Sequence, residues 1–409
     1  MRSRLGARLG RSRSGRYIES VDALIVDAVR SPIGKRNGTL ASLRADELAA
    51  QVLNGLVERV ELDPAEIEDV QLGCVTQYSE QALNVGRIVP LLAGWPETVC
   101  GTTVDRQCGS SMQTAMNAAS AIQAGHLDVV VAAGLEAMSR VPMGSNLGEA
   151  GWAGFSEFFS PKLLEQWDIV HQGVSAEAIA EKWGFSREQL DEYSLESHRR
   201  AIRAIDEGRF EREIIPIEVS NPHVGVVFAV DETPRRDTSL EKLASLKPAF
   251  SEDGKITAGN ASQIVDGAAA MLVVSERAAD RLGLEPRARF VSFGLAGVDP
   301  HRMLHGNPQA CDAALARANL SWDDMSVIEV NEAFASVALQ FMRDARLEDR
   351  AADVNPNGGG ISLGHPLGAT GARVTATLLN ELERREARYG VATMCIGFGM
   401  ALAGVVERL

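Results

Sequence analysis

The strongest chemical signal in the sequence is Cys108, which lies in the run 105–111 directly before a helix-forming stretch. A thiol at a helix N-terminus meets unpaired backbone N–H groups and the positive end of the helix dipole, and both favour the thiolate. Cys108 is therefore a candidate nucleophile. The alternative, from this segment alone, is a small residue that packs at a strand-to-helix corner.

A nucleophilic thiol needs a base, and the glycine-rich segment 357–371 contains His365. Its many glycines allow the backbone to approach a bulky ligand and place His365 at a tight turn before a second helix. The segment is not a P-loop, because no Gly-Lys-Ser/Thr follows, and it lacks the context of a dinucleotide fingerprint. The alternative is a structural histidine.

Two further polar groups follow strand-like runs. Cys395 ends one run just before Gly397, and the ends of parallel strands are where α/β proteins gather their sites, so Cys395 is a candidate second reactive thiol. Asn331 follows the apolar run 327–330, where its amide either orients a water or carbonyl or caps a helix. The other cysteines are assigned to packing: Cys74, Cys100 and Cys311.

The elements around these residues repeat. A helix predicted over 113–124 precedes a strand at 128–133, and a helix predicted over 372–385 precedes a strand at 390–395. Each helix follows a loop that carries one of the candidate residues. This alternation predicts an α/β protein with an internally duplicated architecture.

The segment 140–260 mixes aromatic residues, prolines and charges, and it is predicted to be an inserted subdomain. Ser186 and Gln189 form a capping-box pattern at the start of an amphipathic helix that extends to about Ile205. A linker is predicted at 282–286.

Residues 1–17 form an arginine-rich leader that is predicted to be a disordered extension, with six arginines and no acid in its first sixteen residues. The alternative is a mitochondrial transit segment, which would place the protein in the mitochondrial matrix.

Composition excludes several classes of protein. The 409 residues are 45% hydrophobic and 23% charged, which is typical of globular chains. The formal charge of −14 argues against nucleic-acid binding, and no apolar run reaches the length of a membrane span. The five cysteines include no CxxC pair, so we expect no metal site and a reducing compartment, the cytoplasm.

Taken together, the motifs resemble the thiolase family from about residue 21 to the C-terminus. The resemblance includes the Cys108, Asn331 and His365 segments and Cys395–Ile396–Gly397. It extends to four further runs, at 27–35, 134–139, 257–262 and 266–270.

The resemblance implies a duplicated thiolase fold with five α-β-α-β-α layers. It implies an N-terminal domain over 18–282, with an inserted CoA-binding loop subdomain at about 140–260, and a C-terminal domain over 286–409. The implied reaction is thiolytic cleavage of a 3-oxoacyl-CoA by CoA, a reversible Claisen condensation catalysed by an acetyl-CoA C-acyltransferase. CoA and acyl-CoA are then substrates rather than cofactors, and the implied assembly is a homodimer or homotetramer.

The same resemblance implies the role of each catalytic residue. Cys108 would be acylated, and His365 would withdraw its proton. Cys395 would protonate the departing enolate, or deprotonate acetyl-CoA in the synthetic direction. One oxyanion pocket would consist of His365 and a water held by Asn331, and the other of the N–H groups of Cys108 and Gly397. CoA contacts would come from His171, Arg235, Ala258, Ser262, Ala333 and Phe334, with Arg235 at the nucleotide phosphates.

Three features depart from the family pattern. Gln172 stands where methionine is common, Phe398 stands where many members have glycine, and the loop 303–308 differs from that of short-chain acetoacetyl-CoA enzymes. The loop argues against acetoacetyl-CoA as the sole substrate, and an acetyl-CoA acetyltransferase that forms acetoacetyl-CoA stays as the close alternative. Phe398 is the feature that favours a second alternative, a non-catalytic acyl-CoA-binding subunit. A decarboxylating condensing enzyme fits less well, because such enzymes usually lack a second catalytic thiol.

Overall fold

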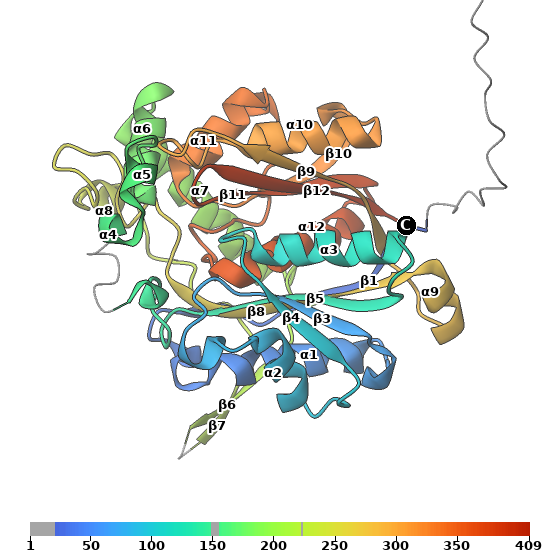
Figure 1. Ribbon diagram of the computed structural model, residues 1–409. Helices are drawn as coiled ribbons and strands as arrows, with labels where there is room; N and C mark the ends of the chain where they lie inside the picture. Colours follow the sequence, from blue (N-terminus) through green and yellow to red (C-terminus); the bar gives the residue numbers. More distant parts are fainter. Residues whose placement is uncertain (1–20, 149–154, 222–223) are drawn as a thin grey trace, which may run out of the picture.

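Two half-sheets with the same strand plan lie on either side of a central pair of helices (Figure 1). The computed structural model describes residues 21–148, 155–221 and 224–409, so the predicted leader at 1–17 lies outside the described residues. Within that part of the chain, no helix is long and apolar enough to cross a membrane.

The strands are β1 (Ala23–Arg30), β2 (Gly34–Lys35), β3 (Asp69–Gly73), β4 (Cys100–Val104), β5 (Val129–Ala137), β6 (Ile217–Asn221), β7 (Val224–Phe228), β8 (Val265–Ser275), β9 (Ala288–Gly297), β10 (Met325–Val330), β11 (Tyr389–Ile396) and β12 (Met400–Arg408). The α-helices are α1 (Ala45–Arg59), α2 (Val85–Leu92), α3 (Ser110–Gln123), α4 (Phe155–Phe158), α5 (Pro161–Leu164), α6 (Gln172–Lys182), α7 (Arg187–Asp206), α8 (Leu240–Ala244), α9 (Glu276–Leu282), α10 (Asn307–Ala318), α11 (Ala335–Asp344) and α12 (Thr370–Arg384).

The two half-sheets confirm the predicted duplication. In the first, β3 is parallel to β5, which is antiparallel to β8, which is antiparallel to β1. In the second, β10, β11, β12 and β9 repeat the same order and the same directions. A short pairing between β1 and β9 joins the halves. The predicted loop–helix–strand units are α3 with β5 and α12 with β11.

Five layers result. Helices α1 and α2 cover the outer face of the first half-sheet, α10 and α11 cover the outer face of the second, and α3 and α12 fill the middle (Figure 1). Strand β1 shows why its sequence is apolar throughout: Ile25 packs in the central core, while Leu24 and Val26 face the outer core. A sheet buried on both faces requires such continuous hydrophobic runs.

The central helices approach each other closely at Gly371. A Cβ built there would lie 2.2 Å from the backbone nitrogen of Met112 on α3, so only glycine fits. The two halves of the chain are therefore in direct backbone contact at the middle of the molecule.

The chain between β5 and β8 leaves the sheet and contributes α4 to α8 and the β6–β7 hairpin. The predicted capping box is confirmed: Ser186 Oγ accepts from the Gln189 amide at 3.2 Å, and Gln189 Oε1 accepts from the Ser186 amide at 2.9 Å. The helix that it starts, α7, ends at Asp206, one residue beyond the prediction.

One prediction about cysteines is wrong. Cys74 and Cys311 are buried, but Cys100 is exposed at the start of the edge strand β4. The local sequence does not predict this exposure, because it depends on the position of β4 in the sheet. Strand β4 pairs on one side only and leaves its outer edge to solvent.

Candidate active site

Cys108 lies between β4 and α3, two residues before the helix begins, and is 3% exposed. Burial raises the pKa of its thiol to about 12, although hydrogen bonds from the backbone of Cys108 and Gly397 and from the Gln172 side chain lower it. The effect of burial on the thiol pKa thus outweighs the effect of the helix N-terminus, which was expected from the sequence to favour the thiolate. The resting thiol is protonated, and a nucleophilic role requires a base.

Cys395, the last residue but one of β11, is fully buried. Burial raises the pKa of its thiol above the ordinary range, and the nearby Cys108 raises it further. This electrostatic effect indicates that the two thiols, which come from opposite halves of the chain, lie close together. Both are protonated at rest, so Cys395 can donate a proton, whereas Cys108 must lose its proton to a base before it attacks.

His365 is 4% exposed. Burial, and then the charge of Arg373, lower the pKa of its imidazole to about 3, so the ring is neutral at physiological pH. Its Nδ1 lies 2.5 Å from Thr370 Oγ1, whose own hydroxyl donates to the carbonyl of Pro366 at 2.8 Å. Thr370 therefore accepts the Nδ1 hydrogen, which leaves Nε2 as a free base.

Thr370 was not identified from the sequence. The signal that could have found it is a hydroxyl residue at a helix start, five positions after a histidine. Thr370→Val should lower kcat by about tenfold, the value of one hydrogen bond, because Nδ1 loses the partner that fixes its tautomer. KM should stay unchanged, and Thr370→Ser should restore kcat. Steady-state kinetics on the three proteins test this, and an unchanged kcat in the valine variant would contradict it.

Asn331 lies beside His365, with Nδ2 at 3.3 Å from the imidazole Nε2. It follows β10, and its backbone N–H donates to the backbone carbonyl of Thr393 on β11 at 3.0 Å, two residues before Cys395. Its buried Oδ1 has no hydrogen-bond partner in the described part of the chain. An unsatisfied buried acceptor at this point suits a bound water or a substrate group.

Two buried carboxylates hold the catalytic loops, and the sequence reasoning assigned neither a role. Glu136 accepts from the amides of Val75, Thr76 and Gly368, at 2.9–3.0 Å, and so ties the loop after β3 to the His365 segment. Glu332 accepts from the Ile361 amide at 3.1 Å and from Ser197 Oγ at 2.7 Å. The glycine-rich segment is thus fixed at both ends of its turn.

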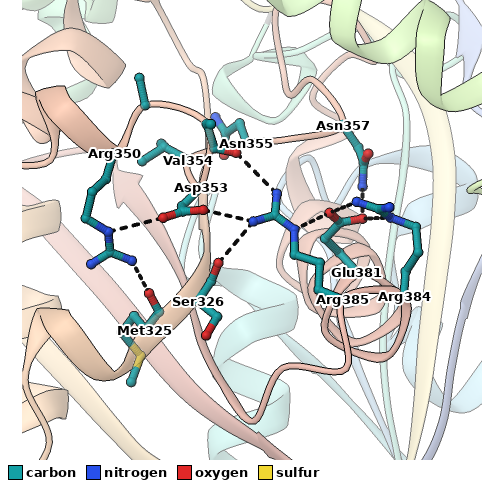
Figure 2. A network of polar contacts seen from close by, with 12 residues as sticks. Met325, Ser326, Arg350, Asp353, Val354, Asn355, Asn357, Glu381, Arg384 and Arg385 are labelled. Carbon is teal, nitrogen blue, oxygen red and sulfur yellow. Dashed lines mark hydrogen bonds and ion pairs between the residues drawn. The ribbon is translucent and has the colours of Figure 1, made fainter.

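A polar network anchors the start of the same segment (Figure 2). Arg385, which directly follows α12, contacts Asp353 at 2.9 Å and Glu381 at 2.6 Å, and Glu381 accepts from Asn357 Nδ2 at 3.1 Å. Burial opposes ionisation of Glu381, but the hydrogen bonds from Arg384, Arg385 and Asn357 outweigh it and lower its pKa to about 2. The chain that leads to His365 is therefore clamped to the end of α12.

The predicted catalytic residues come together. Gly397 approaches Cys108 through its amide, Cys395 is coupled to Cys108, and Asn331 contacts His365. Leu367, two residues after His365, belongs to the same small hydrophobic cluster as Cys108. One catalytic loop from the first half of the duplicated fold and three from the second therefore form one buried centre.

The predicted CoA contacts divide into two groups. Arg235, Ala258 and Ser262 line a cleft of about 650 Å³, together with Lys35 and Arg36. Its charged lining is three bases and one acid, Glu232, which lies 3.7 Å from Lys35. The cleft thus has net positive charge in a chain of net charge −14, as a phosphate-bearing ligand requires.

The other group lies between the cleft and the thiols. His171 stacks on Phe250, with ring centroids 5.4 Å apart, and Phe250 meets Phe334 edge to face at 6.1 Å. Phe334 and Ala333 are buried, and the carbonyl of Ala333 accepts from the Ser262 amide at 2.9 Å. Ala333 and Phe334 therefore shape the wall behind the cleft rather than line it.

Gly397 offers a test with a matched control. A Cβ at Gly397 would meet nothing closer than 3.7 Å, so Gly397→Ala should fold normally. The methyl group would stand on the residue whose amide hydrogen-bonds to Cys108, 3.7 Å from the Gln172 side chain, and kcat/KM should fall by about 100-fold, as on weakening of an oxyanion donor. Gly399→Ala should instead lower Tm, because residue 399 has φ +84° and its Cβ would lie 2.3 Å from the carbonyl oxygen of Val298. Similar Tm losses in both variants would contradict this distinction.

Comparison with known proteins identifies the fold and the site. The family model "Thiolase, N-terminal domain" matches residues 23–277, and "Thiolase, C-terminal domain" matches residues 284–408. The chain belongs to the thiolase family.

Several relatives match this thiolase over nearly their whole length. The steroid 3-ketoacyl-CoA thiolase FadA6 of Mycobacterium tuberculosis is 46% identical over 97% of this chain and 96% of its own. The 3-oxoadipyl-CoA/3-oxo-5,6-dehydrosuberyl-CoA thiolase of Escherichia coli is 44% identical over 95% of this chain and 100% of its own. The crystal structure of the Bacillus anthracis acetyl-CoA acetyltransferase superposes with a TM-score of 0.88 at 41% identity, over 95% of this chain and 99% of that chain. The protein is a thiolase and an acyltransferase that acts on CoA thioesters.

Proposed function

We propose that this thiolase cleaves 3-oxoacyl-CoA thioesters larger than acetoacetyl-CoA, in a degradative pathway of the β-oxidation type. The observation that supports this best is the coupled pair Cys108 and Cys395, with the Gly397 amide directed at Cys108. The loop 303–308 departs from the pattern of short-chain acetoacetyl-CoA enzymes. Relatives named for steroid and dicarboxylic 3-oxoacyl-CoA substrates support an acyl group larger than acetyl.

The proposed cycle begins with the free thiol. Cys108 Sγ attacks C3 of the 3-oxoacyl-CoA while His365 Nε2 takes the thiol proton. The C2–C3 bond breaks, and the electron pair goes to C2 of the leaving acetyl-CoA. Cys395 donates its proton to C2, and acetyl-CoA is released.

The second half of the cycle restores the enzyme. The incoming CoA thiol gives its proton to the Cys395 thiolate, and its sulfur attacks the thioester carbon on Cys108. The shortened acyl-CoA leaves, and the Cys108 thiolate recovers its proton from the His365 imidazolium. The amides of Cys108 and Gly397 are proposed to stabilise one oxyanion, and His365 with a water on Asn331 the other.

Arg235, with Lys35 and Arg36, is proposed to hold the phosphates of CoA in the 650 Å³ cleft. Ala258 and Ser262 would contact the CoA part of the substrate there. His171, Ala333 and Phe334 would contact the thiol end of CoA between the cleft and Cys108. The proposed N-terminal domain at 18–282 carries Cys108, and the proposed C-terminal domain at 286–409 carries Cys395. We also propose a homodimer or homotetramer, which the mass in light scattering would establish.

The test is the CoA-dependent loss of 3-oxoacyl-CoA absorbance with purified protein, with acetyl-CoA measured as product. Wild type is compared with Cys108→Ala and with Cys311→Ala, a buried cysteine outside the site. Loss of activity in the first variant alone supports the proposal. Equal rates in all three proteins would contradict it, and acyl-CoA binding without turnover would favour a non-catalytic subunit. Activity on acetoacetyl-CoA alone would favour the acetyl-CoA acetyltransferase alternative.

A further inference from the structure

Phe398 adopts a backbone conformation that is rare for a bulky residue. Its φ is +65°, in the left-handed region that glycine occupies most readily. It is one residue from Gly397 and three from Cys395. Strained residues of this kind persist mainly where the side chain has a function, so the position of the ring calls for an explanation.

The ring belongs to a small aromatic assembly. It meets Phe159 edge to face, with centroids 5.7 Å apart, and Phe159 meets Phe158 in the same way at 5.5 Å. The amide of Phe398 donates to Met303 Sδ at 3.4 Å, and Met303 belongs to the same hydrophobic cluster as Cys395. We call Phe158, Phe159 and Phe398 the aromatic wall.

The aromatic wall stands where the buried centre meets solvent. Cys395 is fully buried and Cys108 is 3% exposed, whereas Phe398 is 37% exposed and Phe158 is 58% exposed. The exposure of apolar side chains continues along the neighbouring segment, with Leu163, Leu164 and Trp167. Large apolar side chains left in contact with water beside a catalytic centre indicate a ligand-binding surface.

A polar contact between Asp168 and His301 holds this segment against the loop that follows β9. Asp168 Oδ2 lies 2.8 Å from His301 Nδ1, two residues from Met303. The segment 157–168 carries three acids, Glu157, Glu165 and Asp168, and one base, Lys162. A chain ending in a carboxylate would therefore meet net negative charge here, whereas an uncharged apolar chain would not.

The polar CoA cleft lies elsewhere, at Arg235, Ala258 and Ser262. Its inner wall leads to His171, and the next residue, Gln172, hydrogen-bonds to Cys108. The acyl part of the substrate must leave Cys108 in a direction that CoA does not occupy. The aromatic wall, one residue beyond Gly397, supplies apolar surface in that position.

We propose that the aromatic wall binds the acyl chain beyond C3 and selects bulky, uncharged, apolar acyl groups, including ring-bearing ones, over acetoacetyl-CoA and over ω-carboxylated chains. Phe398 is the specificity-determining residue, and its strained backbone directs the ring onto Phe159. This inference rests on the proposed function, because it concerns the acyl group that the thiolase cleaves.

The test uses the full-length enzyme and two independent variants. Phe398→Gly removes the ring and also relieves the left-handed strain, so it should fold at least as well as wild type. Phe159→Ala removes the partner ring without touching the catalytic loop. Leu92→Ala, at an exposed position on α2, is the matched control. The measured quantity is kcat/KM for four substrates: acetoacetyl-CoA, 3-oxohexadecanoyl-CoA, a 3-oxoacyl-CoA with a terminal cyclohexyl ring, and 3-oxoadipyl-CoA.

Wild type should prefer the long-chain and cyclohexyl substrates. Both wall variants should lose about tenfold in kcat/KM on these two and stay within about twofold on acetoacetyl-CoA, as expected for lost apolar contacts with the acyl chain. Equal losses on all four substrates, or wild-type preference in both variants, would overturn the inference. So would a wild-type preference for 3-oxoadipyl-CoA, or a fall in assembly mass in the wall variants, which would assign the surface to a second copy. An inactive wild type would instead contradict the proposed function.

Discussion

Replacing Cys395 by alanine is expected to lower thiolysis by about 10³-fold while leaving acyl exchange through Cys108 nearly intact. Cys395 is proposed to move a proton at C2, and loss of a positioned acid or base costs on the order of 10²–10⁴ in rate. Transfer of an acetyl group from acetyl-CoA to Cys108 breaks a C–S bond, needs no proton at C2, and uses His365 as the base. The two thiols should therefore separate cleanly in partial reactions.

Two isotope measurements distinguish them. Exchange of labelled CoA into acetyl-CoA reports acyl transfer to Cys108, and uptake of deuterium at C2 of acetyl-CoA reports proton transfer by Cys395. Cys395→Ala should retain the first within about threefold and lose the second. Cys108→Ala should lose the exchange, and Cys311→Ala should keep both. Deuterium uptake at the wild-type rate in Cys395→Ala would assign the proton to another group.

Replacing His365 by alanine is expected to lower kcat by about 10³-fold and to change how the reactivity of Cys108 depends on pH. In the native site, burial lowers the pKa of His365 to about 3 and raises that of Cys108 to about 12. Neither group titrates between pH 6 and 9, so the pair stays neutral and the base remains available throughout. Alkylation of Cys108 by iodoacetamide should then be nearly independent of pH in this window.

Without His365, alkylation needs the free thiolate, and its fraction rises about tenfold per pH unit below the thiol pKa. The rate in His365→Ala should follow that slope from pH 6 to 9. His126→Ala, at an exposed position, should behave as wild type. A native rate that already rises tenfold per unit would show that Cys108 reacts without the imidazole.

Each member of the proposed catalytic set sits in a local pattern that is visible in the sequence. Cys108 precedes a helix, Cys395 ends a strand, and His365 lies in a glycine-rich turn. The helix–strand units of both halves were also visible, since their apolar periodicity depends on near neighbours. Pairing of the units into one site came from the family resemblance rather than from these patterns.

Properties that depend on distant segments were not predictable. The helix N-terminus suggested a thiolate at Cys108, but the total burial from several loops reverses the direction of the shift. The contact between Phe398 and Phe159 joins residues far apart in the chain, and Gln172 reaches Cys108 from α6. Exposure of Cys100 likewise follows from its place on an edge strand, which composition does not encode.

Because α3 and α12 approach each other closely at Gly371, the distance between Cys108 and His365 depends on how the two halves of the chain pack together. Cys108 precedes α3, and His365 precedes α12, so any sliding of one helix along the other changes the reach between nucleophile and base. A single methyl group at 371 would meet the Met112 backbone and act as a wedge. Catalysis at the thioester carbon would then be lost through a residue that contacts no substrate. The residues that one half of the chain can accept at this contact therefore depend on those of the other half.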